Sequence, residues 1–149
     1  MKIYLAGPLF TPAERRFIDE CAAQLRGAGF DVFVPHEHEL ALDGTVTASR
    51  IFAKDWAALS QSNAVLAILD GPVIDDGTAC EIGIFYGLLQ SDPSKKGIVG
   101  MTHDLRATRG SNREGELKGL NLFVAGCIEA VGTIVTSLAE AQTVLEGWR

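Results

Sequence analysis

The sequence has few of the features that mark disulfide-rich, membrane or nucleic-acid-binding proteins. Its 149 residues include three cysteines, which are too few and too scattered for a disulfide framework or a zinc site. It contains no run of 18 apolar residues, so we expect no membrane span. Lys and Arg number 13 against 19 Asp and Glu, for a net charge of −6. This charge disfavours a nucleic-acid polymer as partner.

Several motifs are also absent. The patterns G-x-G-x-x-G and G-x-x-x-x-G-K-[ST] do not occur, which argues against hydride transfer and triphosphate chemistry. There is no G-x-S-x-G nucleophile elbow either. Met1-Lys2 leads directly into a strand-like run, so we expect no signal peptide and a cytoplasmic location. The hydrophobic content of 47% and the length are typical of one globular domain, which we place at residues 1–149.

Apolar runs and amphipathic segments alternate along the whole chain. Successive strand–helix–strand units connect right-handedly and form parallel sheets. The sequence therefore predicts an α/β fold, a three-layer sandwich around a five-stranded parallel sheet. Ligands of such sheets bind beyond the carboxyl ends of the strands. The predicted strands are 2–6, 30–35, 64–69, 97–101 and 133–135, and the predicted helices are 12–27, 49–59, 78–89, 121–130 and 137–145.

Local signals predict where the first two helices begin. Thr11 and Glu14 have the spacing of a capping box, and Pro12 suits the first helical position. For the second helix, Ser49 is a candidate N-cap. The expected buried face of that helix consists of Ile51, Phe52, Trp56 and Leu59.

The densest group of acidic residues follows the third predicted strand, where 70–77 holds three aspartates and Glu81 comes shortly after. One interpretation is structural, because Thr78 and Glu81 have capping-box spacing in the first turn of the next helix. The other is chemical. Glu81 shares a helical line with Phe85 and its apolar neighbours, and a partly desolvated carboxylate is a suitable nucleophile for sugar chemistry. Gly77 leaves room for a ligand beside it.

Two more side chains are candidates for the same crevice. Asp55 shares a helical line with Ile51 and Leu59, so it projects from the inner side of its helix. Tyr4 lies in the first strand, and its hydroxyl needs a partner if it is buried. By contrast, the alternating residues 36–39 (HEHE) lack a further ligand cluster, so we interpret them as a solvated loop and expect no metal site.

Four segments carry a recognisable pattern: YLAGPLF at 4–10, IFAKD at 51–55, LDGPVIDDGTACEIG at 69–83 and NLFVAG at 121–126. Together they resemble the nucleoside 2-deoxyribosyltransferases. The segments occur in the family's order and span nearly the whole chain. The resemblance implies a flavodoxin-like, doubly wound fold and a retaining double displacement on 2′-deoxynucleosides and free nucleobases, in nucleoside salvage.

The resemblance also implies roles for individual residues. Glu81 matches the nucleophile that attacks C1′ and forms a deoxyribosyl-enzyme ester, which a second nucleobase then opens. Tyr4 matches the tyrosine that orients this nucleophile. Asp75 matches an aspartate that contacts sugar or base, and Asp55 one that assists proton transfer to the leaving nitrogen.

Further expectations follow from the same resemblance. Asn121 matches a residue that reaches the 5′-hydroxyl in a neighbouring subunit, so a homo-oligomer would be needed for activity. The family requires no metal or organic cofactor. The remaining expected substrate contacts are Gly7, Leu9, Phe10, Asp76 and Gly77.

Two alternatives stay open. Related proteins hydrolyse the N-glycosidic bond of nucleoside 5′-monophosphates with the same glutamate, and Arg106 and Arg109 in the loop before Asn121 could bind such a phosphate or cover the site. A non-catalytic nucleotide-binding module would have the same fold. Products formed with and without an acceptor base distinguish the three.

Overall fold

The computed structural model describes residues 1–38, 46–104 and 119–149. Five strands form one parallel sheet in the order β2-β1-β3-β4-β5, which is the flavodoxin-like doubly wound order. This confirms the predicted fold class. The strands are β1 (Lys2–Ala6), β2 (Asp31–Phe33), β3 (Ala64–Ile68), β4 (Gly97–Met101) and β5 (Thr133–Val135).

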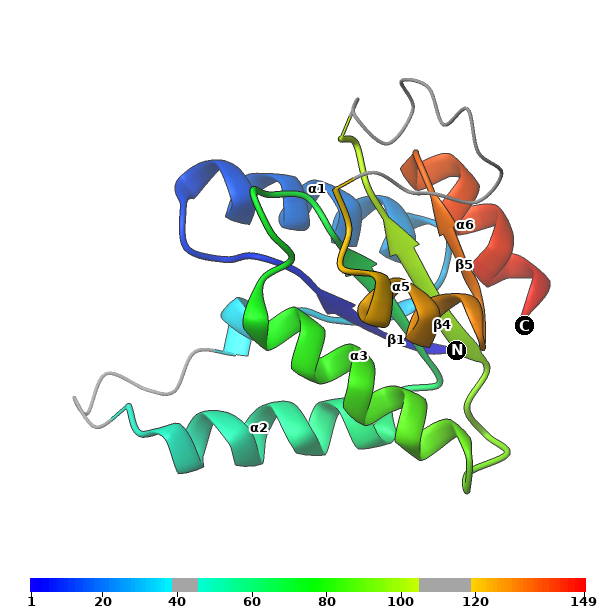
Figure 1. The fold of residues 1–149 in the computed structure, drawn as a ribbon, viewed down its shortest axis with the longest axis horizontal. Helices are drawn as coiled ribbons and strands as arrows, with labels where there is room; N and C mark the ends of the chain where they lie inside the picture. Colours follow the sequence, from blue (N-terminus) through cyan, green and yellow to red (C-terminus); the bar gives the residue numbers. More distant parts are fainter. Residues whose placement is uncertain (39–45, 105–118) are drawn as a thin grey trace.

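Helices cover both faces of the sheet and make the predicted three layers (Figure 1). One face packs against α1 (Pro12–Gly27) and α6 (Leu138–Gly147). The other packs against α2 (Ala48–Gln61), α3 (Asp76–Leu89) and α5 (Leu122–Glu129). β3 and β4 are buried along their whole length, as expected for strands covered on both sides.

The start of α1 agrees with the prediction. Thr11 is its N-cap, and the Glu14 side chain accepts from the Thr11 backbone in a complete capping box. The segment after β2, predicted to be a loop, instead begins with the short 3₁₀-helix η1 (Pro35–His38). η1 places the His36 side chain next to α1, where its Nε2 lies 2.8 Å from Asp19 Oδ1.

The predicted details of α2 are wrong at two points. Its N-cap is Thr47, not Ser49. Of its four expected buried residues, only Leu59 is buried. The other three are exposed, and Phe52 is the most exposed of them at 60%; the remaining two are Ile51 and Trp56. The physical reason is that the buried residues of α2 lie near its C-terminal end, while its N-terminal half lies beside the strand ends (Figure 1).

The predicted start of α3 is also wrong. Asp75 is the N-cap and accepts from the Thr78 backbone N–H, so Thr78 does not cap the helix and its capping box with Glu81 does not form. Helical residues begin at Asp76, which places Glu81 in the second turn. The Glu81 carboxylate is therefore not engaged by the helix's own first turn.

The switch point of the sheet lies between β1 and β3, where the strand order reverses. Gly7 follows β1 there, and a Cβ at this position would come within 2.7 Å of Ile18 Cδ1. Glycine thus allows the loop to lie directly on α1. In the described ranges, every helix is too short or too polar to cross a membrane.

Candidate active site

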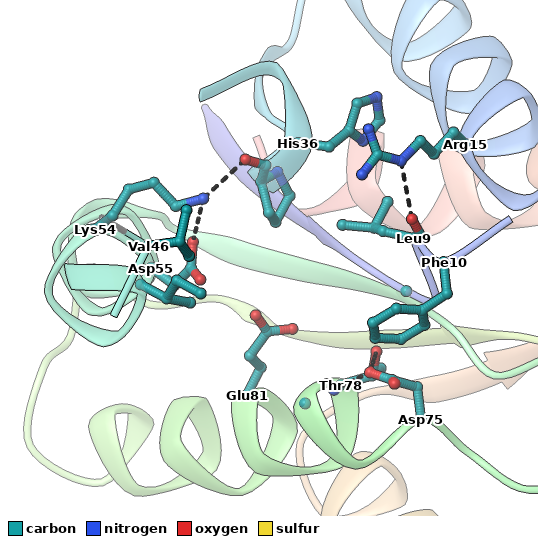
Figure 2. Close-up of a pocket in the computed structure, with 14 residues that line it drawn as sticks. Leu9, Phe10, Arg15, His36, Val46, Lys54, Asp55, Asp75, Thr78 and Glu81 are labelled. Carbon is teal, nitrogen blue, oxygen red and sulfur yellow. Dashed lines mark hydrogen bonds and ion pairs between the residues drawn. The ribbon is translucent and has the colours of Figure 1, made fainter. Parts of the chain in front are cut away.

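A cavity of about 430 Å³ lies at the switch point, where doubly wound folds bind their ligands. Figure 2 shows acidic side chains from α2 and α3 lining it opposite residues of α1 and η1. It is lined by Gly7, Leu9, Phe10, Arg15, Pro35, His36, Val46, Ile51, Lys54, Asp55, Asp75, Gly77, Thr78 and Glu81.

The Tyr4 hydroxyl and the Glu81 carboxylate form a hydrogen bond on the face of the sheet that α3 covers. Tyr4 is fully buried in β1, and its hydroxyl donates to Glu81 Oε1 at 2.5 Å. The Tyr4 ring stacks on Phe33 of β2 with centroids 5.4 Å apart. A phenol fixed on both sides in this way orients the carboxylate, because it restricts both the position and the direction of the donor.

The environment of Glu81 favours its protonated form more than water does. Its pKa is raised to about 7, first by burial and also by the negative charges of Asp55 and Asp75, while the Tyr4 hydrogen bond acts in the opposite direction. The pKa of Tyr4 is also raised, by burial first and then by Glu81. At neutral pH the phenol is therefore a hydrogen-bond donor, and a substantial fraction of Glu81 is ionised.

A second charged group lies on the α2 wall of the cavity. Lys54 Nζ donates to the Pro35 carbonyl oxygen at 2.9 Å and forms an ion pair with Asp55 Oδ1 at 3.3 Å. Figure 2 shows the Lys54 ammonium between these two groups. Burial raises the pKa of Asp55, and Lys54 opposes this increase.

Asp75 lies at the other end of the cavity, at the start of α3 (Figure 2). Its Oδ2 accepts from both the backbone N–H and the hydroxyl of Thr78, at 2.8 and 3.0 Å. The two hydrogen bonds hold the Asp75 carboxylate beside the cavity. A Cβ at position 77 would lie 3.2 Å from that oxygen, so glycine there leaves room for the carboxylate.

Three basic side chains of the cavity were not selected from the sequence: Arg15, His36 and Lys54. The Arg15 Nε donates to the Leu9 carbonyl oxygen at 2.9 Å, and His36 is mostly buried, which corrects its interpretation as solvated. Lys54 directly precedes Asp55 in the IFAKD segment. Its position beside a predicted site residue is therefore the signal by which the sequence could have indicated it. For Arg15 and His36 the sequence carries none, because the path of η1 over α1 brings them together.

The structure brings most of the predicted site residues to one cavity, with Tyr4 immediately behind Glu81. Asp76 is not among the lining residues, and its side chain accepts from the Gly77 backbone. Asn121 also lies elsewhere and caps α5 through Phe123 and Val124. The other two predicted residues, Arg106 and Arg109, lie outside the described residues.

The cavity combines three carboxylates with apolar walls. A half-ionised, oriented carboxylate can act as a nucleophile, and a second carboxyl with a raised pKa can carry a proton. In the part of the chain that the structure describes, His, Cys, Asp and Glu side chains form no group of three that could hold a metal ion.

The chain is similar to a known protein family and to several solved structures. A family model described as nucleoside 2-deoxyribosyltransferase matches residues 3–136. Among solved structures, a conserved protein from Enterococcus faecalis superposes with a TM-score of 0.81 at 29% identity, covering 99% of this chain and 98% of that one. No curated protein matches.

Two other solved structures are similar in fold. A 2-deoxyribosyltransferase from Bacillus psychrosaccharolyticus has a TM-score of 0.69 at 23% identity, covering 95% of this chain and 90% of its own. A CMP N-glycosidase from Clostridium botulinum has a TM-score of 0.60 at 16% identity, with both chains covered in full (100%). Because the family model spans nearly the whole sequence, the chain belongs to the nucleoside 2-deoxyribosyltransferase family.

Proposed function

We propose that the protein transfers 2-deoxyribose between nucleobases through a covalent deoxyribosyl-Glu81 intermediate. Family membership supports an enzyme of nucleoside metabolism, acting by deoxyribosyl transfer or by the related cleavage of an N-glycosidic bond. The single observation that carries the finer proposal is the Tyr4–Glu81 pair at the cavity. It supplies an oriented carboxylate whose pKa of about 7 allows ionisation at neutral pH.

In the first half-reaction, a Glu81 carboxylate oxygen bonds to C1′ of the deoxynucleoside while the bond from C1′ to the base nitrogen breaks. The electron pair of that bond goes to the nitrogen, which takes a proton from Asp55. In the second half-reaction, the nitrogen of an acceptor base attacks C1′ from the vacated face, loses its proton to Asp55 and releases Glu81. Two inversions retain the configuration, as in retaining glycosidases.

The two ends of the cavity suit the two parts of a nucleoside. Pro35, Val46 and Ile51 provide an apolar wall near Asp55, which suits the flat face of a base. Asp75 and Thr78, at the start of α3, lie at the other end (Figure 2), where the Asp75 carboxylate suits a sugar hydroxyl. A 2′-hydroxyl would crowd the Glu81 carboxylate, so 2′-deoxynucleosides are the preferred substrates.

A second candidate function is hydrolysis of nucleoside 5′-monophosphates by the same glutamate. The observation that favours it is Arg15 on the cavity wall, because a guanidinium is well suited to bind phosphate. A similar fold also occurs in a CMP N-glycosidase. Transfer remains the first proposal because the matched family model is that of a transferase.

The test is a product analysis with deoxyinosine and adenine, followed by chromatography. Wild-type protein should form deoxyadenosine and hypoxanthine, and inosine should react much more slowly. Free deoxyribose as the main sugar product in the presence of adenine would favour hydrolysis. The same assay with deoxynucleoside 5′-monophosphates tests the second candidate directly.

The matched variants are Glu81→Gln and Glu20→Gln. Glu81→Gln is nearly isosteric and should abolish transfer, because the amide does not form the ester. Glu20→Gln makes the same chemical change on α1, outside the cavity, and should retain the wild-type rate. Transfer at the wild-type rate by Glu81→Gln would overturn the mechanism.

A further inference from the structure

Lys54 makes two contacts that the transfer mechanism above does not use. Its Nζ donates to the Pro35 carbonyl oxygen of η1 at 2.9 Å and lies 3.3 Å from Asp55 Oδ1 on its own helix. The Lys54 and Asp55 side chains are 19% and 21% exposed, so the ion pair is largely shielded from water. The Pro35 contact fixes the ammonium between α2 and η1.

The Asp55 carboxyl depends on this ammonium. Its Oδ1 is buried and accepts no hydrogen bond of good geometry within the described residues. The positive charge of Lys54 Nζ, 3.3 Å away, therefore offsets the cost of burying this oxygen. A buried carboxylate oxygen without such compensation carries a large desolvation cost. Lys54 therefore favours one orientation of the Asp55 carboxyl group, which lines the cavity.

The charge balance of the cavity points to the same residue. Asp55, Asp75 and Glu81 are three carboxylates around one cavity, and each disfavours ionisation of the others. The Lys54 charge acts on both Asp55 and Glu81, and lowers the pKa of each. The positive charge of Lys54 thus stabilises the ionised forms of a carboxylate on α2 and of another on α3.

Resting on the proposed function, we propose that Lys54 is a positioning residue of the transfer reaction. Pinned by the Pro35 carbonyl, its ammonium holds the Asp55 carboxyl at the nucleobase end of the cavity. The same charge offsets the negative charge of Asp55 and Glu81, and so extends the ionised form of Glu81 to lower pH.

The sign of the effect follows from electrostatics. Replacing Lys54 by methionine removes a positive charge that stabilises two carboxylates, so the pKa values of Asp55 and Glu81 should both rise. Activity that requires ionised Glu81 should then be lost at a higher pH than in the wild type. The other titratable groups that border this cavity are Tyr4 from β1, Arg15 from α1, His36 from η1 and Asp75 at the start of α3.

The first measurement does not depend on turnover. Carboxyl ¹³C signals of Asp55 and Glu81 are followed against pH by NMR in the wild type, Lys54→Met, Lys54→Arg and Lys96→Met. Both midpoints should move upward in Lys54→Met and stay near wild type in Lys54→Arg, which keeps the charge. Lys96→Met makes the same change at an exposed position just before β4, outside the cavity, and should leave both unchanged. If Lys54→Met does not fold, Lys54→Gln replaces it, because its amide can still donate to Pro35.

The second measurement is kcat/KM for deoxyinosine plus adenine as a function of pH. Lys54→Met should lose several times more activity at about pH 5.5 than at about pH 8.5, and Lys54→Arg should restore the wild-type profile. A uniform loss at every pH, or unchanged NMR midpoints, would overturn the proposal. If the wild type neither transfers nor hydrolyses, the proposed function fails, and the NMR midpoints alone decide the role of Lys54.

Discussion

At the scale of single residues, Glu81 is held between two opposing effects. Burial and neighbouring carboxylates favour its neutral form, while the Tyr4 hydroxyl and Lys54 favour its charge. A fully hydrated carboxylate is a poor nucleophile, and a carboxyl group that stays protonated does not act as a nucleophile. The balance near pH 7 therefore suits the proposed reaction, and it has a cost in stability that can be measured.

That cost depends on pH in a defined direction. The folded-state pKa of Glu81, about 7, lies above its ordinary value of 4.5, so the folded protein binds the proton more tightly than the unfolded chain does. Its contribution to stability is fully present below about pH 4.5 and is lost as pH rises through about 7. Compared with Glu81→Gln, the wild type should lose about 3 kcal/mol between these limits.

Urea unfolding of both proteins at several pH values measures this difference. The Gln variant can still accept from Tyr4, so the hydrogen bond is kept and the charge is the main change. The wild-type free energy of unfolding should fall relative to the variant between about pH 5 and pH 8. Parallel curves across this range would mean that burial does not perturb the carboxyl group.

At the scale of elements, a single residue at the start of α3, Asp75, both caps the helix and lines the cavity. Asp75 caps the helix by accepting from Thr78 and also faces the cavity. Asn is as good an N-cap as Asp, whereas Ala is not. We expect Asp75→Ala to lose about 1 kcal/mol of stability and Asp75→Asn to stay near wild type, as measured by urea unfolding.

The same two variants separate capping from the proposed substrate contact. If the Asp75 charge contacts the sugar, kcat/KM for a deoxynucleoside should fall in both variants, although Asp75→Asn remains stable. Wild-type kcat/KM in Asp75→Asn would limit the residue to capping. Equal stability of the two variants would instead contradict the capping assignment.

The order and type of the elements could be predicted because each has a local signal. Buried parallel strands are short apolar runs, and α1 carries its complete capping box. The buried face of α2 was predicted wrongly for a physical reason. Periodicity identifies which residues share a face, but the buried residues of α2 lie near its C-terminal end, whereas Phe52 in its N-terminal half is 60% exposed. The start of α3 was missed because Asp75 caps the helix three residues before Thr78.

The candidate site could be predicted in part for the same reason. Glu81 and Asp55 each share a helical line with apolar residues, and the structure places both on the cavity wall. Tyr4 was selected because a buried hydroxyl needs a partner, and Glu81 is that partner. His36 reaches the cavity through the path of η1, and no spacing along the chain encodes such a path.

At the scale of the whole molecule, we propose that residues 1–149 are one domain. The two apolar cores lie on opposite faces of a single sheet, so neither can lose its packing without exposing β1, β3 and β4. Trp56 on α2 and Trp148 at the end of α6 lie on the two sides. Single-tryptophan variants, Trp56→Phe and Trp148→Phe, should show superimposable urea transitions that also match circular dichroism. Separate midpoints would indicate two folding units.

The proposed oligomer concerns the start of α5. Asn121 accepts from Phe123 and Val124 through its Oδ1, which directs its amide nitrogen to other partners. Next to it, Leu122 is 72% and Phe123 83% exposed. Large apolar side chains so exposed on a monomer often mark an interaction site. We therefore expect α5 to be covered by a second subunit whose cavity Asn121 completes.

Subunit mixing tests this expectation. Glu81→Gln lacks the proposed nucleophile, and Asn121→Asp keeps the cap of α5 but loses the amide donor, so each variant alone should be nearly inactive. In a mixed oligomer, Glu81 of one chain and Asn121 of the other come together in an intact site. Unfolding and refolding the two together should restore up to about a quarter of the wild-type sites if chains pair at random. Each variant refolded alone cannot form that site and serves as the control. If the mixture is no more active than the two variants refolded separately, Asn121 does not contribute to the active site of a neighbouring subunit.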